Sequence, residues 1–229
     1  MKICGLQKMT LLDYPGKVAC TVFTGGCNFR CPFCHNASLV LHQDKQRLVL
    51  TEDFFSFLRK RQGILDGVCI TGGEPLLQAD IADFLYQVKS LGFAVKLDTN
   101  GSFPQRLNEL VQEGLLDYVA MDVKSSPAHY REAAGIEPFD FAAIKQCIDF
   151  LLSEPVDYEF RTTVVKGLHD AIVLQDAASL IAGAKRYYLQ KFEDSGDLIG
   201  THLSAFTDDE MQRFLQVVSP FVHFAALRG

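Results

Sequence analysis

The regular alternation of short β-rich runs with amphipathic helical segments constrains the fold of this chain most. We expect strands at residues 18–23, 67–71, 94–98, 118–123, 158–165 and 187–192, and helices at about 52–61, 79–91, 104–113, 139–152 and 172–184. Strands that alternate with helices of ten or more residues form βαβ units around a parallel sheet. The alternation therefore predicts an α/β protein.

About six such units fit an open, partial (β/α)6 barrel of the TIM type better than the closed eight-fold barrel, which typically needs ~250 residues. A doubly wound sheet is the competing architecture. We expect one domain over residues 1–229, with a core at about 16–193 and a short C-terminal extension at about 195–229. In that extension, Thr207 and Glu210 form a capping-box pattern that opens a helix ending near Val218, and residues 221–225 are a candidate last strand.

Composition and charge argue against two classes of partner. The 229 residues carry a net charge of −6 and no basic run, which argues against nucleic acid binding. No apolar stretch approaches the eighteen or so residues that cross a bilayer, and the N-terminus lacks the apolar core of a signal peptide. We therefore expect a cytoplasmic protein whose seven cysteines do not form a disulfide framework.

Three of those cysteines, Cys27, Cys31 and Cys34, stand close together directly after a Gly-Gly pair. Short cysteine runs of this kind hold iron–sulfur clusters, usually with four thiolates. Three thiolates on a four-iron cluster leave one iron without a protein ligand, and open metal positions are where substrates bind. The alternative is structural zinc with His35 as a fourth ligand, although adjacent residues rarely point at one ion.

Polar residues gather at the expected carboxyl ends of the strands, which form the active face of parallel α/β folds. They are the cysteine loop, Gly72-Gly73-Glu74, Asp98 with Thr99, Asp122 with Lys124, and Gln190. Glycines let a ligand approach the backbone closely, and Glu74 offers acceptors to an ammonium group. The plainer interpretations are a strand-to-helix turn for Gly-Gly-Glu-Pro and an ordinary ion pair for Asp122 and Lys124.

Taken together, these motifs resemble those of the radical S-adenosylmethionine enzymes. They are Cys-x₃-Cys-x₂-Cys at 27–34, Gly-Gly-Glu-Pro at 72–75, Leu-Asp-Thr-Asn-Gly at 97–101 and Met-Asp-Val-Lys at 121–124. Within that group the chain is most similar to the glycyl-radical activating enzymes, above all to the longer form that activates anaerobic ribonucleoside-triphosphate reductase. The segments that carry this closer resemblance are 10–23, 34–36, 118–124 and 158–165, and the resemblance spans about residues 5–193.

The resemblance implies cofactors, a reaction and a partner. Cys27, Cys31 and Cys34 would hold a [4Fe–4S] cluster, and the amino and carboxylate groups of S-adenosylmethionine would bind the open iron. One electron would break the sulfonium bond to the 5′ carbon, and the 5′-deoxyadenosyl radical would take a hydrogen from a backbone glycine of the partner. The partner would be anaerobic ribonucleoside-triphosphate reductase, with flavodoxin or ferredoxin as the electron donor.

The resemblance also implies which residues contact S-adenosylmethionine. Gly72, Gly73 and Glu74 match the segment that receives the methionyl ammonium group. Asp122 and Lys124 match a segment near the ribose and the carboxylate. Phe33 and His35, which flank Cys34, would lie near the adenine.

Two further roles follow from the same resemblance. Asp98, Thr99 and Asp122 match positions that hold a monovalent cation in a related activase, which implies a bound Na⁺ or K⁺. Asp13 matches a position near the incoming glycine loop of the partner protein.

The chain departs from related activases at two places. Phe192 stands where a related activase has a histidine, and Gln190 is a weak substitute for that adenine contact. The inserted ferredoxin-like domain of many activases is absent, because no cysteine lies between Cys34 and Cys69. The competing functions are a radical enzyme for a small molecule, of the 7-carboxy-7-deazaguanine synthase type, and a zinc-dependent binding module.

Overall fold

The computed structural model describes residues 1–228, which form eight strands in one sheet with the linear order β1 to β8. The strands are β1 Ile3–Thr10, β2 Ala19–Thr24, β3 Gly67–Gly72, β4 Ala94–Thr99, β5 Tyr118–Asp122, β6 Asp157–Val164, β7 Tyr187–Lys191 and β8 Ala225–Arg228. Strand β1 is antiparallel to β2, whereas β2–β3, β3–β4, β6–β7 and β7–β8 are parallel pairs. The predicted α/β class with a mostly parallel sheet and a C-terminal helix and strand is confirmed.

The chain divides into two compact units. The first comprises residues 1–28, 38–99 and 105–119, and the second comprises residues 29–37, 100–104 and Ala120 onward. The cysteine segment crosses from the first unit to the second after Asn28, so that Cys27 belongs to one unit and Cys31 and Cys34 belong to the other.

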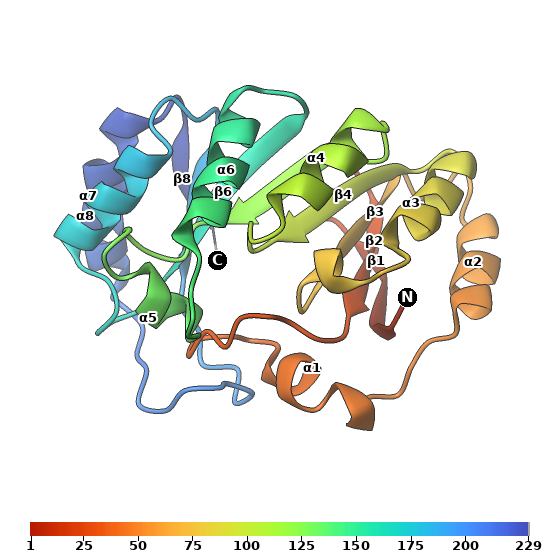
Figure 1. Cartoon of the computed structure of the whole chain (residues 1–229), viewed down its shortest axis with the longest axis horizontal. Coiled ribbons are helices and arrows are strands. Elements are labelled where there is room, and N and C mark those ends of the chain that lie inside the picture. Colours follow the sequence, from red (N-terminus) through yellow and green to blue (C-terminus); the bar gives the residue numbers. More distant parts are fainter. Residues whose placement is uncertain (229) are drawn as a thin grey trace. The chain divides into compact units, whose positions relative to one another are not determined.

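Strands β1 to β4 of the first unit are accompanied by helices α2 Thr51–Arg59, α3 Ile81–Ser90 and α4 Pro104–Gln112 (Figure 1). Strand β3 is a continuous apolar run that is completely buried at Val68 to Ile70, as expected for a parallel strand covered on both faces. The rings of Phe54 on α2 and Phe84 on α3 stack with their centroids 5.2 Å apart. Their helical spacing places these apolar residues on the buried face of each helix.

The second unit contains strands β6 to β8 with helices α5 Tyr130–Ala134, α6 Phe141–Leu152, α7 Ala171–Leu180 and α8 Asp208–Val218. The predicted capping box of α8 is present, because Thr207 and Glu210 cap each other's backbone N–H groups. Helices α7 and α8 lie side by side, and α8 also contacts β8 (Figure 1). The C-terminal extension therefore belongs to the fold of this unit and adds a parallel strand beside β7.

Three details of the secondary structure differ from expectation. The last strand is Ala225–Arg228, not 221–225, because Ser219–Phe221, which contains Pro220, forms a 3-10 turn. Strand β1 at the end of the sheet is not predicted, since it alternates only weakly between buried and exposed positions. The short helices α1 Ala37–Leu41 and α5 have too few residues to show a helical period.

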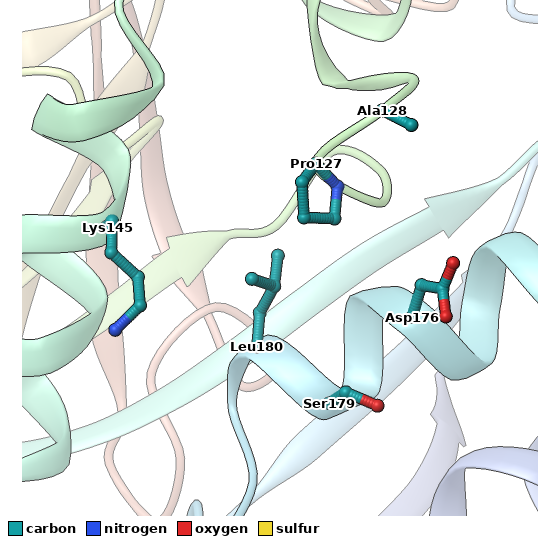
Figure 2. Close-up of a pocket in the computed structure, with 6 residues that line it drawn as sticks. All are labelled: Pro127, Ala128, Lys145, Asp176, Ser179 and Leu180. Carbon is teal, nitrogen blue, oxygen red and sulfur yellow. The ribbon is translucent and has the colours of Figure 1, made fainter.

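Three further findings concern membrane-crossing helices, the cysteines and a surface pocket. Within residues 1–228, no helix has both the length and the apolarity needed to cross a membrane, and none of the seven cysteines forms a disulfide. A surface pocket of about 450 Å³ lies in the second unit, between helices α6 and α7, and Figure 2 shows the residues that line it. Its lining residues are Pro127, Ala128, Lys145, Asp176, Ser179 and Leu180. None of these is a predicted site residue.

Candidate functional site

The predicted site residues are divided between the two units. The first unit holds Asp13, Cys27, Gly72, Gly73, Glu74, Asp98 and Thr99, and the second holds Cys31, Phe33, Cys34, His35, Asp122, Lys124 and Gln190. Within each unit, several of these residues are in direct contact or share a common neighbour.

The Gly72-Gly73 turn of the first unit lies directly against the backbone that leads into the cysteine segment. The N–H of Gly73 donates to the carbonyl of Thr24 at 2.9 Å, and the N–H of Glu74 donates to the carbonyl of Gly26 at 2.8 Å. A Cβ atom at Gly73 would lie 1.9 Å from the carbonyl oxygen of Gly26. Glycine is therefore required here, because only the absence of a side chain lets the two backbone segments approach this closely.

Glu74 and Thr99 of the first unit are joined by a hydrogen bond. Glu74 is completely buried, and its Oε1 atom accepts from the Thr99 hydroxyl at 2.9 Å and from the N–H of Leu76 at 3.1 Å. The carboxylate thereby caps the short 3-10 turn Pro75–Leu77. Gly-Gly-Glu-Pro therefore forms the turn after strand β3, as the plainer interpretation has it, and it also brings the Glu74 carboxylate to the hydroxyl of Thr99.

The remaining side chains of the first unit have polar partners as well. Asp98 forms an ion pair with Lys96, a residue of the same strand that is almost completely buried. The carboxylate of Asp13 accepts a hydrogen bond from the hydroxyl of Thr21 on β2. Asp13 follows the exposed side chains of Leu11 and Leu12, which are 69% and 86% exposed.

The cysteine loop of the second unit is held from two sides by backbone hydrogen bonds. The N–H of Cys34 donates to the carbonyl of Cys31 at 3.0 Å, which closes a tight turn. The N–H of Arg30 donates to the carbonyl of Ala134 at the end of α5, at 2.9 Å. The N–H of Gly200 donates to the carbonyl of Pro32 at 2.7 Å. These hydrogen bonds hold the backbone of the cysteine loop against the end of α5 and against the segment around Gly200.

The contact with Gly200 leads to a first prediction. A Cβ atom at Gly200 would lie 2.7 Å from the Cβ atom of Pro32, and overpacking of this kind costs about 1–3 kcal/mol. We expect Gly200→Ala to loosen the cysteine loop and to speed alkylation of the buried Cys31 thiol by about tenfold. Mass spectrometry of protein treated with iodoacetamide measures that rate. Thr201→Ala, a change at an exposed neighbour, is the control, and equal rates in both variants would contradict the prediction.

The two thiols of this loop are protonated at neutral pH in this arrangement. Burial raises the pKa of Cys31 to about 11, against the opposing effect of the Lys124 ammonium group. Burial also raises the pKa of Cys34, opposed by the N–H of Asn36 and by Lys124. Because thiolates are the metal-binding form, metal binding must release these protons. Within residues 1–228, no three His, Cys, Asp or Glu side chains lie close enough together to hold a metal ion.

Asp122 of the second unit lies between two cations. Its Oδ2 atom is 2.9 Å from Lys124 Nζ, and its Oδ1 atom is 3.0 Å from Arg161 Nε. Burial alone would raise the pKa of Asp122, but Arg161 and Lys124 outweigh it and lower the pKa to about 2. The ion pair of the plainer interpretation is therefore present, and Arg161 joins it as a second cation. Two cations around one ionised carboxylate favour an anionic group of a ligand nearby, such as a carboxylate.

The backbone of Lys124 is held by His169, a residue that the sequence does not single out. His169 is buried, its Nδ1 atom accepts from the N–H of Val165 at 3.0 Å, and its Nε2 atom lies 2.9 Å from the carbonyl of Lys124. This pattern requires the neutral tautomer with hydrogen on Nε2. Burial also lowers the pKa of His169. The ring of Phe33 lies edge-on to the imidazole, with centroids 6.3 Å apart, so His169 positions both neighbours.

The two aromatic residues that flank Cys34 have different surroundings. Phe33 is buried, and the Lys124 ammonium nitrogen is 6.0 Å from its ring centroid. His35 is exposed, and its ring centroid is 5.6 Å from that of the buried Phe192. Phe192, which stands where a related activase has a histidine, therefore packs against His35, a predicted adenine-site residue. Gln190 is half-buried on β7, opposite Thr163 of β6.

Three functional candidates thus emerge only from the structure: Lys96, Arg161 and His169. A signal exists for Lys96, because a lysine two positions before Asp98 in an apolar strand shares its face. Arg161 has only a weak signal, because the other residues of β6 include Glu159, Thr162 and Thr163. His169 lies in a loop and has no such signal.

Comparison with known proteins identifies what this chain is similar to. Residues 21–179 match the model of the Radical SAM superfamily. A Methanocaldococcus jannaschii protein named "Putative glycyl-radical enzyme activating enzyme MJ1227" is 31% identical over 236 residues, which cover 99% of this chain and 95% of that protein. The pyruvate formate-lyase-activating enzyme of Clostridium pasteurianum is 32% identical over 129 residues, 54% of this chain and 52% of that enzyme.

Solved structures show the same fold at lower identity. A domain of the pyruvate-formate lyase-activating enzyme from Bacteroides vulgatus superposes with a TM-score of 0.59 at 18% identity, over 71% of this chain and 99% of that domain. At this identity the likeness concerns the fold alone. It agrees with an α/β arrangement in which the sheet does not close on itself.

Proposed function

Because the chain belongs to the radical S-adenosylmethionine superfamily, we propose that it activates a glycyl-radical enzyme. Membership implies a [4Fe–4S] cluster and S-adenosylmethionine. The observation that carries the proposal is the match to the methanogen relative, which extends over almost the whole length of both chains. The partner we propose is anaerobic ribonucleoside-triphosphate reductase, with flavodoxin or ferredoxin as the electron donor.

We propose Cys27, Cys31 and Cys34 as the cluster ligands. Their spacing is the reason, and three cysteines that form no disulfide and the fixed turn from Cys31 to Cys34 suit the role. The cluster, when bound, supplies the electron that cleaves S-adenosylmethionine so that a hydrogen atom can be taken from a glycine of the partner. Metal binding is coupled to local folding, so the loop would complete its arrangement as the cluster forms. Seven cysteines that form no disulfide also suit the reducing cytoplasm, where we propose that the protein works.

The protein's own groups would orient the S-adenosylmethionine molecule. We propose that the turn at Gly72, Gly73 and Glu74 receives the methionyl ammonium group, and the packing of Gly73 against the carbonyl of Gly26 holds this turn beside the backbone that leads to Cys27. Lys124 and Arg161 suit the carboxylate, and ionised Asp122 can accept from ribose hydroxyls. Phe33 and His35 offer aromatic surface for the adenine, with Phe192 supporting His35.

Two parts of the proposal depend on the resemblance more than on contacts. Asp13, beside an exposed apolar turn, is proposed to meet the glycine loop of the partner. The resemblance also implies a monovalent cation at Asp98, Thr99 and Asp122, a site that the observed contacts do not favour. Its carboxylates already form ion pairs with Lys96, Lys124 and Arg161, and a further cation would have to compete with these.

Anaerobic reconstitution with iron and sulfide tests the function. We expect a brown protein that converts S-adenosylmethionine to 5′-deoxyadenosine under reduction, and a glycyl-radical EPR signal when the anaerobic reductase is added. A colourless protein with stoichiometric zinc would exclude radical chemistry. Deoxyadenosine without a glycyl radical would exclude this partner. Conversion of a small molecule, as in 7-carboxy-7-deazaguanine synthase, is then the remaining function to assay.

A second prediction concerns Asp122. Asp122→Asn keeps the shape but removes the charge, and bonds to charged groups contribute about 1.5–3 kcal/mol. We expect the variant to retain its iron but to bind S-adenosylmethionine at least about tenfold more weakly, as measured by calorimetry. Asp149→Asn, which breaks the exposed pair with Lys145, is the matched control. Equal affinities of wild type and Asp122→Asn would remove Asp122 from the binding site.

A further inference from the structure

Lys96 is a charged residue in the interior of the first unit. Its side chain is only 1% exposed, in the middle of strand β4. An ammonium group at such a position is costly unless it is paired and hydrogen-bonded. The Lys96 ammonium contacts Asp98 Oδ1 and lies 3.8 Å from the sulfur of Cys69. Lys96 is therefore a buried, paired charge of the first unit and not a surface residue.

The register of the sheet explains why the ammonium reaches Asp98. Lys96 and Asp98 are two residues apart on one strand, so both side chains lie on the same face. Cys69 on β3 is the register partner of Lys96, which places its thiol beside the lysine chain. Asp98 is 15% exposed, so the pair runs from the interior towards the carboxyl end of β4. Thr99 and Glu74, which hydrogen-bond to each other, follow directly at that end.

We propose that the Lys96 ammonium is the permanent cation at Asp98 and takes the place of a bound Na⁺ or K⁺. The inference builds on the proposed function, because the expected cation belongs to the S-adenosylmethionine site. Lys96 is a positioning residue: it neutralises Asp98 and fixes the direction of its carboxylate. A mobile ion placed there as well would face a like charge at short range in a partly buried site.

Exchange of the cation in solution provides the test. We expect wild-type reconstituted protein to bind S-adenosylmethionine with the same affinity in potassium chloride, sodium chloride or choline chloride at constant ionic strength. Lys96→Met keeps the length of the side chain and removes its charge. In choline chloride we expect this variant to bind about tenfold more weakly, and potassium or sodium should restore most of the loss.

Thermal unfolding of the cluster-free protein gives a second readout that does not depend on the proposed function. Potassium should raise the Tm of Lys96→Met relative to choline, and should leave the Tm of wild type unchanged. Lys89→Met, at the partly exposed pair with Asp117, is the matched control and should not respond. The double variant Lys96→Met/Asp98→Asn should also be insensitive, because it has no carboxylate for the ion to neutralise.

The outcomes separate this inference from the proposed function. Failure to bind S-adenosylmethionine in any salt would overturn the function, while the cluster-free Tm series would still decide the role of Lys96. A Lys96→Met protein that ignores potassium in both readouts would overturn the inference. Should that variant not fold, the wild type decides: an affinity that rises when potassium replaces choline contradicts the proposal, and a constant affinity supports it.

Discussion

Cys31→Ala protein is expected to bind almost no iron after anaerobic reconstitution and to release no 5′-deoxyadenosine above background. A site with three thiolates has no ligand to spare, because clusters are normally held by four. Cys31 is also the most buried cysteine of the motif, with 7% exposure, so water cannot readily replace its thiolate. Iron analysis and the visible absorption spectrum measure the loss, together with chromatography of the deoxyadenosine product.

Cys147→Ala is the matched control for this experiment. It makes the same chemical change at a buried cysteine of helix α6, outside the motif. Since alanine is the best helix former, we expect full iron content and wild-type cleavage. An unchanged iron content in Cys31→Ala would contradict the assignment of this residue as a ligand.

Arg228→Ala is expected to destabilise the protein by about 1.5–3 kcal/mol, because it removes two charge-assisted hydrogen bonds from the buried Glu159 carboxylate, while Arg228 itself is 31% exposed. Arg228 on β8 contacts the completely buried Glu159 through two hydrogen bonds of 2.6 and 3.0 Å. Its guanidinium carbon also lies 3.7 Å from the ring centroid of Tyr188. The pair attaches the C-terminal strand to the second unit, and urea unfolding followed by circular dichroism measures the effect.

Two further variants show whether the buried charge causes this loss. Arg131→Ala removes an exposed partner of Glu137, and exposed pairs contribute at most about 1 kcal/mol. The double variant Arg228→Met/Glu159→Gln replaces both charges and should recover much of the stability. A change below about 1 kcal/mol in Arg228→Ala would show that the pair does not stabilise the protein.

The sequence predicts the parallel part of the fold well, because the spacing of apolar residues and the turn-forming residues between elements are local properties. Each expected strand from 18–23 to 187–192 overlaps an observed strand from β2 to β7, and Thr207 with Glu210 opens α8 as predicted. The N-terminal strand β1 is not predicted, because its pairing with β2 depends on a neighbour and not on its own pattern. The last strand begins at Ala225 and not at residue 221, because Ser219–Phe221, which contains Pro220, forms a 3-10 turn.

For the candidate site as well, the local motifs can be predicted from the sequence and the long-range partners cannot. Cys-x₃-Cys-x₂-Cys and Gly-Gly-Glu-Pro can be recognised in the sequence, because the residues of each motif lie at fixed, short spacing along the chain. The partners of the site residues cannot be read in this way. Arg161 reaches Asp122 across 39 positions of sequence, and His169 reaches the carbonyl of Lys124 across 45. Contacts at this separation depend on how the strands are packed.

By itself, therefore, the sequence determined the α/β class, the cysteine motif and the set of polar residues at the strand ends, since each depends on local periodicity or on fixed spacing. Only the tertiary structure decided which charges face one another. It paired Asp98 with the buried Lys96, set Asp122 between Lys124 and Arg161, and attached β8 through Arg228 and Glu159. Burial makes such pairings obligatory, but the partner is chosen by the register and packing of strands that lie far apart in the chain.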